Sequence, residues 1–402
     1  MTSRSRATGV LWGMCTLIAI NQLGFGAVVP VLALYAQSFG VTQTAIGLAI
    51  AIYGLARFLI AMPAGQLADR LGRRVALALG GLVTAAGNLL CAYAPSYPAF
   101  VGARFVAGAG AALVLTAGQI VLADITTPAR RGRVMAIYQG VFLFAVGIGP
   151  WPGGLLAERY GLAAPFLVYA VAGALASAVA WIMIPDTRRF SAADGAGAAA
   201  PALAFAAQIR YLTRRVGFVL VGLVSFTNAV ARTGALFSVI PVLAHDRLAL
   251  STDRIGLGLA LASVVGLALA YPAGALVDRY GRKTVIVPST IMAGVSVVLF
   301  VAAPSYAWFL AACVAWSVAG GISGAAPATY AADVAPPGMN AAAMSGYRTV
   351  SDLGYVIGPI ALGLATDLAG ADATLMATAA LLVVVALAFW RFAPESFRPQ
   401  PP

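Results

Sequence analysis

An all-α membrane protein is the fold class that this sequence predicts, with twelve transmembrane helices in two pseudo-symmetric six-helix bundles around a central cavity. Its 402 residues are 61% hydrophobic and 9% charged, with a mean hydropathy of +0.92. Such a composition is typical of a chain surrounded mainly by lipid. Twelve apolar windows have the length of about 20 residues that crosses the hydrocarbon core. One charged motif and several prolines also recur at a constant spacing.

The predicted spans follow one another with short polar connections. The first span follows two arginines and so resembles a signal peptide. It is too long for one and lacks a small-residue cleavage site, so we interpret it as a transmembrane helix. In chain order the spans are 10–35, 44–66, 75–94, 98–121, 134–156, 161–184, 216–241, 254–276, 284–303, 307–330, 341–365 and 373–392.

The positive charges predict the orientation of these spans. If the N-terminus is cytoplasmic, 18 of the 25 Lys and Arg residues lie in cytoplasmic segments, three in outer loops and four within spans. This asymmetry predicts that both termini are cytoplasmic. The net charge of +12 therefore indicates topology, and we expect no nucleic-acid partner. The Ala- and Arg-rich composition favours a multi-pass protein of a bacterial cytoplasmic (inner) membrane.

Metal, disulfide and catalytic sites are not expected. The three cysteines, Cys15, Cys91 and Cys313, lie far apart in apolar runs and suit helix packing. His245 is the only histidine, which argues against a histidine metal site or a catalytic triad. We expect no cofactor and no enzymatic activity.

An internal repeat defines the organisation. The segment 65–74 (GQLADRLGRR) reappears as 274–283 (GALVDRYGRK), at an offset of 209 that also relates prolines, glycines and aspartates over about a hundred residues. A register held this long predicts two copies of a six-span unit, in parallel orientation because six is even. The predicted domains are bundles at 1–185 and 215–402, joined by a cytoplasmic linker at 186–214 with a short interfacial helix near 200–212.

Three motifs resemble those of the major facilitator superfamily. The segment 65–74 resembles motif A, and 274–283 resembles its second copy. The stretch from Arg104 to Gly110 is similar to motif B. The stretch 145–154 (AVGIGPWPGG) is similar to motif C, with Ala145 where glycine is usual, and this resemblance implies the twelve-span drug–proton antiporter branch. Its glycines let helices approach closely and Pro150 is expected to kink span 5. The residues of this packing motif are Gly149, Pro150, Gly153, Gly154, Gly358 and Pro359.

The resemblance implies a cytoplasmic gate. Motif A would latch the two halves through Asp69 at the N-terminus of span 11 and through an Arg73–Asp124 ion pair. Rocking of the halves would break and remake these contacts, giving alternating access. A plain solvated turn is the simpler alternative. The predicted gate residues are Gly65, Asp69, Arg70, Gly72, Arg73, Asp124, Asp278, Arg279, Arg282 and Asp333.

Five ionisable residues fall inside the spans: Arg57, Arg104, Arg232, Arg348 and Asp352. A charge at this depth is costly and normally faces a partner or a wet cavity. Asp352 is the only carboxylate in the middle of a span. It is a candidate proton carrier, or else a permanent partner of Arg348 at i and i+4. The resemblance implies that Arg104 takes part in proton coupling.

The substrate cavity is predicted from the polar residues of the spans. Span 1 has neutral amides where cation exporters often carry an acid, and the intramembrane charge is net +3, which favours a neutral or anionic substrate. Interhelical hydrogen bonds are the alternative role. The predicted cavity residues are Asn21, Gln22, Arg57, Gln119, Tyr138, Gln139, Asn228, Arg232 and Arg348.

The function predicted is secondary active export of a small amphipathic molecule or drug by proton antiport, performed by a monomer. The alternative is a dedicated exporter or flippase for an anionic or neutral metabolite, sugar or lipid. A membrane receptor on the same scaffold is a third reading, which the intact latch motifs count against. The sequence contains no Walker A motif, which disfavours ATP-driven pumping.

Overall fold

The computed structural model describes residues 3–126, 128–187, 205–323, 326–336 and 339–396, and within these ranges every regular element is a helix. Twelve helices, or runs of two or three consecutive helices, of the described chain are long and apolar enough to cross a membrane. The twelve predicted spans and the all-α fold class are therefore confirmed. An α-helix pairs most of its backbone N–H and C=O groups within one segment, which is what a spanning segment requires in lipid.

The chain forms two compact units. Unit 1 comprises residues 1–41, 48–197 and 251–260, and unit 2 comprises 42–47, 198–250 and 261–402. Each unit thus includes the first residues of one helix from the other half of the sequence. These residues are the start of α12 in unit 1 and the start of α2 in unit 2.

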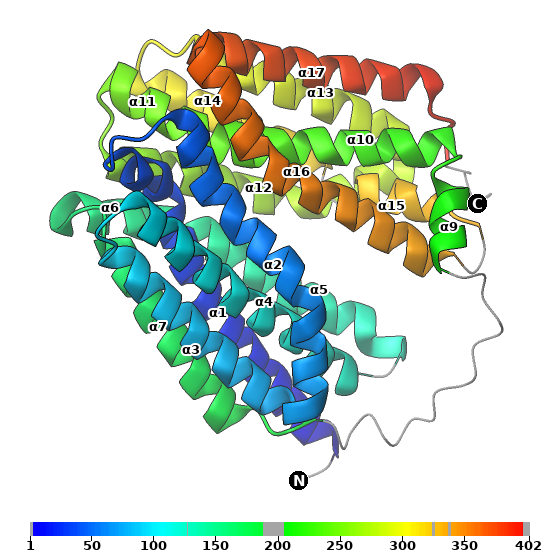
Figure 1. Cartoon of the computed structure of the whole chain (residues 1–402). Helices are drawn as coiled ribbons and strands as arrows, with labels where there is room; N and C mark the ends of the chain where they lie inside the picture. The colour runs from blue at the N-terminus through cyan, green and yellow to red at the C-terminus, as the bar shows by residue number, and fades with distance from the viewer. Residues whose placement is uncertain (1–2, 127, 188–204, 324–325, 337–338, 397–402) are drawn as a thin grey trace. The chain divides into compact units, whose positions relative to one another are not determined.

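Unit 1 is a bundle in which α3 packs between α4 and α7, and α7 packs against α1 (Figure 1). Its core contains Met14, Leu17 and Leu77, all fully buried. The helices are α1 (Ser3–Gln37), α2 (Gln43–Leu71), α3 (Arg73–Ala92), α4 (Tyr97–Asp124), α5 (Pro128–Ile148), α6 (Pro150–Tyr160) and α7 (Ala164–Met183).

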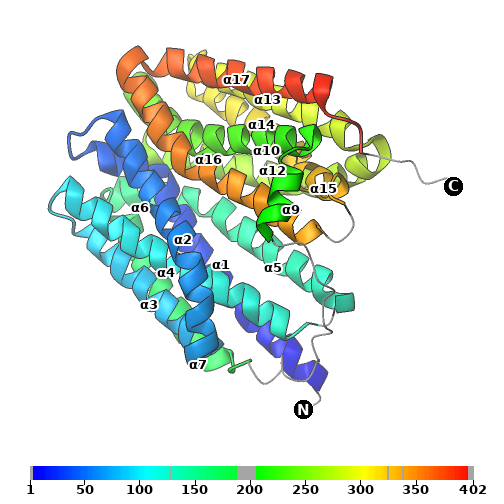
Figure 2. The ribbon, with the colours of Figure 1, turned by 45° about the vertical axis from the view of Figure 1, so that its right-hand side comes forward.

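Unit 2 is a bundle in which α13 packs between α14 and α17, and α16 packs along α10 (Figure 2). Its core contains Val221, Tyr330 and Phe389. The helices are α9 (Phe205–Leu212), α10 (Val216–Val230), the π-helix η1 (Ala231–Val239), α11 (Ile240–Leu248), α12 (Thr252–Tyr280), α13 (Arg282–Val301), α14 (Tyr306–Ser323), α15 (Ala326–Asp333), α16 (Asn340–Ala369) and α17 (Ala371–Phe392).

The fifth and seventh spans each depart from a regular α-helix. The fifth span is divided into α5 and α6 at Gly149, directly before Pro150, whose nitrogen carries no hydrogen for the helical ladder. The seventh consists of α10, η1 and α11, and its nine-residue π-helix was not predicted. In η1, a Cβ added to Gly234 would lie 2.6 Å from the carbonyl oxygen of Gly358 on α16. Glycine therefore permits the wide helix to contact α16.

The predicted linker helix lies partly within the described chain. Residues 188–204 are outside the described residues, and α9 occupies the remainder of the predicted helix. Leu212 is fully buried in the core of unit 2, whereas Arg210 and Tyr211 are exposed. This short helix is therefore amphipathic.

Candidate functional site

The turn between α2 and α3 centres on Arg73. Arg73 Nε lies 2.9 Å from Asp124 Oδ2 at the end of α4, and Arg73 Nη1 lies 3.0 Å from Asp69 Oδ1. The side chains of Arg73 and Asp124 are 10% and 7% exposed, whereas that of Asp69 is 67% exposed. Thr187 Oγ1 also donates a hydrogen bond to Asp124 Oδ2 (2.7 Å). The pairing of Arg73 with Asp124 in the predicted gate is thus present.

Glycine and a neighbouring arginine shape the same turn. Gly72 has a φ of 102°, a backbone conformation that favours glycine. Arg74 Nε donates a hydrogen bond to the carbonyl oxygen of Trp181 (2.7 Å), and its guanidinium carbon lies 4.9 Å from the centre of the Trp181 ring. Arg70 is exposed, and Gly65 is half-buried near Thr116.

The second copy of the turn repeats the ion pair in unit 2. Arg282 Nε lies 2.9 Å from Asp333 Oδ2, with side chains 16% and 29% exposed. Gly281 has a φ of 93°, like Gly72. Ser396 Oγ donates a hydrogen bond to Asp333 Oδ2 (3.2 Å), in the place that Thr187 takes beside Asp124. The side chains of Asp278 and Arg279 lie outside the described residues.

The glycine motif of the fifth span packs against α1. A Cβ added to Gly149 would lie 2.7 Å from the Cα of Gly26, and one added to Gly153 would collide with the carbonyl oxygen of Ala27. Pro150 is buried, and a Cβ on Gly154 would collide with Thr252 at the start of α12.

The equivalent glycine of the second copy, Gly358, is similarly close-packed. A Cβ there would lie 2.8 Å from the Cα of Val230 on α10, and Pro359 is buried beside it. Close backbone approach is therefore shared by both copies of this motif.

Arg104 lies inside unit 1 among aromatic rings. It is 1% exposed, and its Nε donates a hydrogen bond to the carbonyl oxygen of Ala49 (3.3 Å). Its guanidinium carbon lies 4.5 Å from the centre of the Tyr53 ring, within the range of a cation–π interaction. The hydroxyl groups of Tyr53 and Tyr169 are hydrogen-bonded (3.3 Å), and Phe25 stacks on Tyr53 at 5.5 Å between ring centres.

Tyr53 and Tyr169 were not predicted as site residues. Tyr53 precedes Arg57 by one helical turn on α2, so the two share a face, and a tyrosine in the middle of an apolar span carries a hydroxyl that needs a partner. The spacing of Tyr53 from Arg57 is therefore a signal in the sequence that could have identified Tyr53. Arg57 itself is half-buried.

The neutral polar residues of unit 1 do not share one environment. Asn21 and Gln22 on α1 are buried. Tyr138 on α5 is buried, and its hydroxyl has no hydrogen-bond partner among the described residues. Gln119 and Gln139 are exposed on the surface of the unit. The predicted set thus divides into buried and exposed members.

In unit 2 the predicted residues belong to three helices that pack together, namely α10, η1 and α16. Asn228 is half-buried and its side-chain amide donates a hydrogen bond to the carbonyl oxygen of Val224 (2.8 Å). Arg232 is exposed, with its guanidinium carbon 5.8 Å from the centre of the Phe237 ring. On α16, Arg348 is exposed and Asp352 is half-buried.

Carboxylates also lie where α2 and α12 begin. In unit 2, Asp367 near the end of α16 accepts hydrogen bonds from the backbone nitrogens of Gln43 (2.9 Å) and Thr44 (2.8 Å). In unit 1, Glu158 near the end of α6 accepts one from Thr252 Oγ1 (3.2 Å). These two acids are related by the repeat offset of 209, and neither was predicted as a functional residue.

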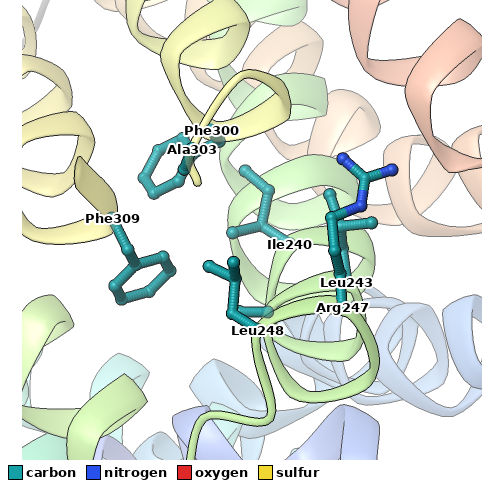
Figure 3. A pocket seen from close by; sticks show the side chains of 8 residues that line it. Ile240, Leu243, Arg247, Leu248, Phe300, Ala303 and Phe309 are labelled. Atoms are coloured by element: carbon teal, nitrogen blue, oxygen red, sulfur yellow. The ribbon is translucent and has the colours of Figure 1, made fainter. Parts of the chain in front are cut away.

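A small apolar pocket in unit 2 contains none of the predicted cavity residues (Figure 3). Arg247 lies at its edge, where its guanidinium group pairs with both carboxylate oxygens of Asp372 (2.6 Å each) and points away from Phe309. The pocket is lined by Ile240, Leu243, Ala244, Arg247, Leu248, Phe300, Ala303 and Phe309.

Comparison with known proteins decides the family. Residues 14–252 and 221–402 both match the Major Facilitator Superfamily, so that nearly the whole chain is covered. The chain belongs to the major facilitator superfamily. It is therefore a membrane transporter of this superfamily and not an enzyme.

Among superfamily members, an uncharacterised transporter of Methanocaldococcus jannaschii is 24% identical over 350 residues, 87% of this chain and 89% of that protein. The inner membrane transport protein YajR of Escherichia coli is 30% identical over 177 residues, 44% of this chain and 38% of YajR. The quinolone resistance protein NorA of Staphylococcus aureus is 26% identical over 167 residues, 42% of this chain and 43% of NorA. The last two matches cover less than half of each protein.

Solved structures of the superfamily share the fold. A D-xylose–proton symporter superposes with a TM-score of 0.75 at 16% identity, over 96% of this chain and 99% of that one. A bacterial homologue of the human lysosomal transporter Spinster, inward-facing and occupied, superposes with a TM-score of 0.77 at 16% identity, over 95% of both chains. At these identities the likeness shows the fold alone.

Proposed function

We propose that this superfamily transporter exports a small amphipathic molecule or drug in exchange for protons, by alternating access. The observation that carries this proposal is the glycine motif at 145–154, which resembles the antiporter motif and packs its glycines against the backbone of α1. The partial match to the quinolone resistance protein NorA supports the same substrate class.

The proposed mechanism divides the chain into bundles at 1–185 and 215–402 that rock about the linker at 186–214. The Arg73–Asp124 and Arg282–Asp333 ion pairs hold the turns that serve as the cytoplasmic gate. The transporter acts as a monomer in a bacterial inner membrane, with both termini in the cytoplasm.

Asp352 is the proposed proton carrier. Among the ionisable side chains of the predicted spans it is the only acid in mid-span, and it is half-buried on α16. A carboxyl group in this position can bind a proton from one side of the membrane and release it to the other when its surroundings change. Arg104 is the proposed second coupling residue.

Substrate-induced proton movement in proteoliposomes tests this function. Liposomes containing the purified protein and a pH dye receive lipophilic cations, neutral drugs and organic anions in turn. We expect at least one compound to move protons through the wild type, and we expect Asp352→Asn to abolish the signal while leaving substrate binding measurable. Asp246→Asn, at an exposed carboxylate near the end of α11, is the matched control and should keep the signal.

The outcomes separate the proposals. Proton movement that survives in Asp352→Asn would remove this residue from the coupling mechanism. If no compound moves protons, antiport is overturned and the second candidate, a dedicated exporter or flippase for an anionic or neutral metabolite, sugar or lipid, takes its place. The buried and uncompensated charge of Arg104 is the observation that favours this second candidate.

A further inference from the structure

Arg104 is a buried cation whose charge the described residues leave uncompensated. The side chain is 1% exposed, and its one described hydrogen bond runs from Nε to the neutral carbonyl oxygen of Ala49. Its Nη1 is buried and has no hydrogen-bond partner among the described residues. Within the described residues, no carboxylate forms an ion pair with Arg104.

The surroundings of Arg104 add positive charge and hydroxyl donors. Arg57 follows Tyr53 by one helical turn on α2, so the two lie on the same face of this helix. The Tyr53 and Tyr169 hydroxyl groups form a hydrogen bond with each other, and such a pair retains one proton to donate. Two guanidinium groups and two phenols are thus gathered in one part of unit 1.

A buried charge without a counter-charge is unfavourable, and charges inside proteins are normally paired or bound to a ligand. A guanidinium group has five N–H donors in a planar fork that matches a carboxylate. The cation–π contact with Tyr53 satisfies the face of the guanidinium group but leaves Nη1 free. The arrangement therefore lacks an anion.

We propose that Arg104 and Arg57 bind the carboxylate of an amphipathic organic monoanion, whose apolar part packs on Phe25 and Tyr53. This inference rests on the proposed function, because it names the chemical class of the transported molecule. Phe25 and Arg57 are half-buried, whereas Tyr53 and Arg104 are buried. Because Arg104 is 1% exposed, binding of the anion requires side chains around it to move.

Equilibrium binding to the purified full-length protein tests the proposal without any transport step. Benzoate is the probe, and benzamide is its neutral match of nearly equal size and shape. The titrations are made by calorimetry with gluconate as the background anion. Benzoate should bind at least about tenfold more tightly than benzamide, because one hydrogen bond to a charged group changes the affinity by about that factor. Chloride should also bind at least about tenfold more weakly than benzoate.

Variants locate the site. Arg104→Gln should weaken benzoate binding by about tenfold to a hundredfold, and Arg57→Gln by a smaller factor, without changing benzamide binding. Arg159→Gln removes an exposed arginine in the last turn of α6, outside the predicted cavity and gate, and is the matched control, which should bind benzoate like the wild type. Tyr53→Phe keeps the ring and should weaken benzoate binding only a few-fold.

Three results would overturn the inference. The first is equal affinity of the wild type for benzoate and benzamide. This comparison uses the wild-type protein alone, so it does not depend on the folding of any variant. The second is unchanged benzoate binding in Arg104→Gln and Arg57→Gln. The third is chloride binding as tight as benzoate binding, which would identify an inorganic anion site. Because no proton is measured, failure here leaves the proteoliposome result intact, and failed antiport leaves this binding result intact.

Discussion

At the scale of single residues, Arg73 contacts two carboxylates that differ in their surroundings. Asp124 is almost completely buried and also accepts a hydrogen bond from Thr187, whereas Asp69 is two-thirds exposed. Water screens the exposed pair strongly and the buried pair weakly. Asp124 therefore holds Arg73 in place, and Asp69 remains available to other partners.

Neutralising these two acids should accordingly have different effects. We expect Asp124→Asn to destabilise the protein by about 2–4 kcal/mol, because it leaves the buried Arg73 without its close counter-charge. Asp69→Asn should cost less than about 1 kcal/mol, as exposed ion pairs do. Apparent melting temperatures of the purified variants in one detergent measure the difference. Equal losses would contradict the assignment of Asp124 as the anchoring partner.

At the scale of helices, the fifth span meets α1 with almost no space between backbones. Gly149 and Gly153 lie where any side chain would contact Gly26 or Ala27. A backbone neighbour cannot move aside like the end of a flexible side chain, so helix separation is the only relief. Gly140 is on α5 too, but a Cβ there would meet nothing within 4 Å.

These glycines allow a matched comparison on one span. Gly149→Ala and Gly153→Ala should each destabilise unit 1 by about 1–3 kcal/mol and lower the yield of monodisperse protein. Gly140→Ala should be neutral or slightly stabilising, because alanine favours a helix over glycine. Size-exclusion profiles and melting temperatures report both effects. A normal profile for Gly153→Ala would mean that the contact with Ala27 is not tight in solution.

The start of α2 is capped by a side chain from a distant part of the sequence. Asp367 accepts hydrogen bonds from two of the first backbone nitrogens of α2, whose free N–H groups and dipole favour a negative charge. Asp367→Ala should therefore cost about 1–2 kcal/mol. Glu158→Ala, the repeat-related change, removes one hydrogen bond to a side chain and should cost less. Thermal melting of the two variants side by side tests this order.

At the scale of the whole molecule, the charge distribution predicts the orientation of the chain. With 18 of 25 Lys and Arg residues on one side, a fluorescent protein fused after Pro402 should fold and fluoresce in the cytoplasm. Alkaline phosphatase inserted at 161–163, between α6 and α7, should be active in the periplasm. Active phosphatase fused at the C-terminus, with an inactive insertion, would show the opposite orientation.

Hydropathy and spacing were sufficient for the architecture but not for the interior contacts. Every span was predicted, because about 20 apolar residues leave lipid as the only suitable surroundings. The Arg73–Asp124 pair was expected from the resemblance to motif A, although Asp124 lies at the end of α4 and not in the turn of Arg73. The contact between Tyr53 and Arg104 was not predicted. Helices α2 and α4 are apolar on nearly every face, so their hydrophobic pattern does not indicate which face each helix turns toward the other. The π-helix in the seventh span had no recognised signal.

The matching bounds of the repeated helices let the chain be compared with itself. Helices α2 and α12 both have 29 residues and α3 and α13 both have 20, at the same offset of 209. At this offset the ion pair of Arg73 with Asp124 recurs as that of Arg282 with Asp333. The residues around Arg104 do not recur. Tyr53, Arg57 and Arg104 correspond to Ala262, Gly266 and Cys313, and Phe25 and Tyr169 to Gly234 and Thr378.

The second copy is thus a naturally occurring counterpart of the first in which this charge is absent. Cys313 is fully buried, as Arg104 is, so a small uncharged side chain is enough for the bundle at that position. After the duplication the two copies kept their ion-paired turns in common and came to differ in their interiors. The second copy differs in the same way, because its Arg232, Arg348 and Asp352 correspond to Leu23, Gln139 and Leu143 of the first. Asymmetry between the copies therefore marks charged positions that the shared fold does not require.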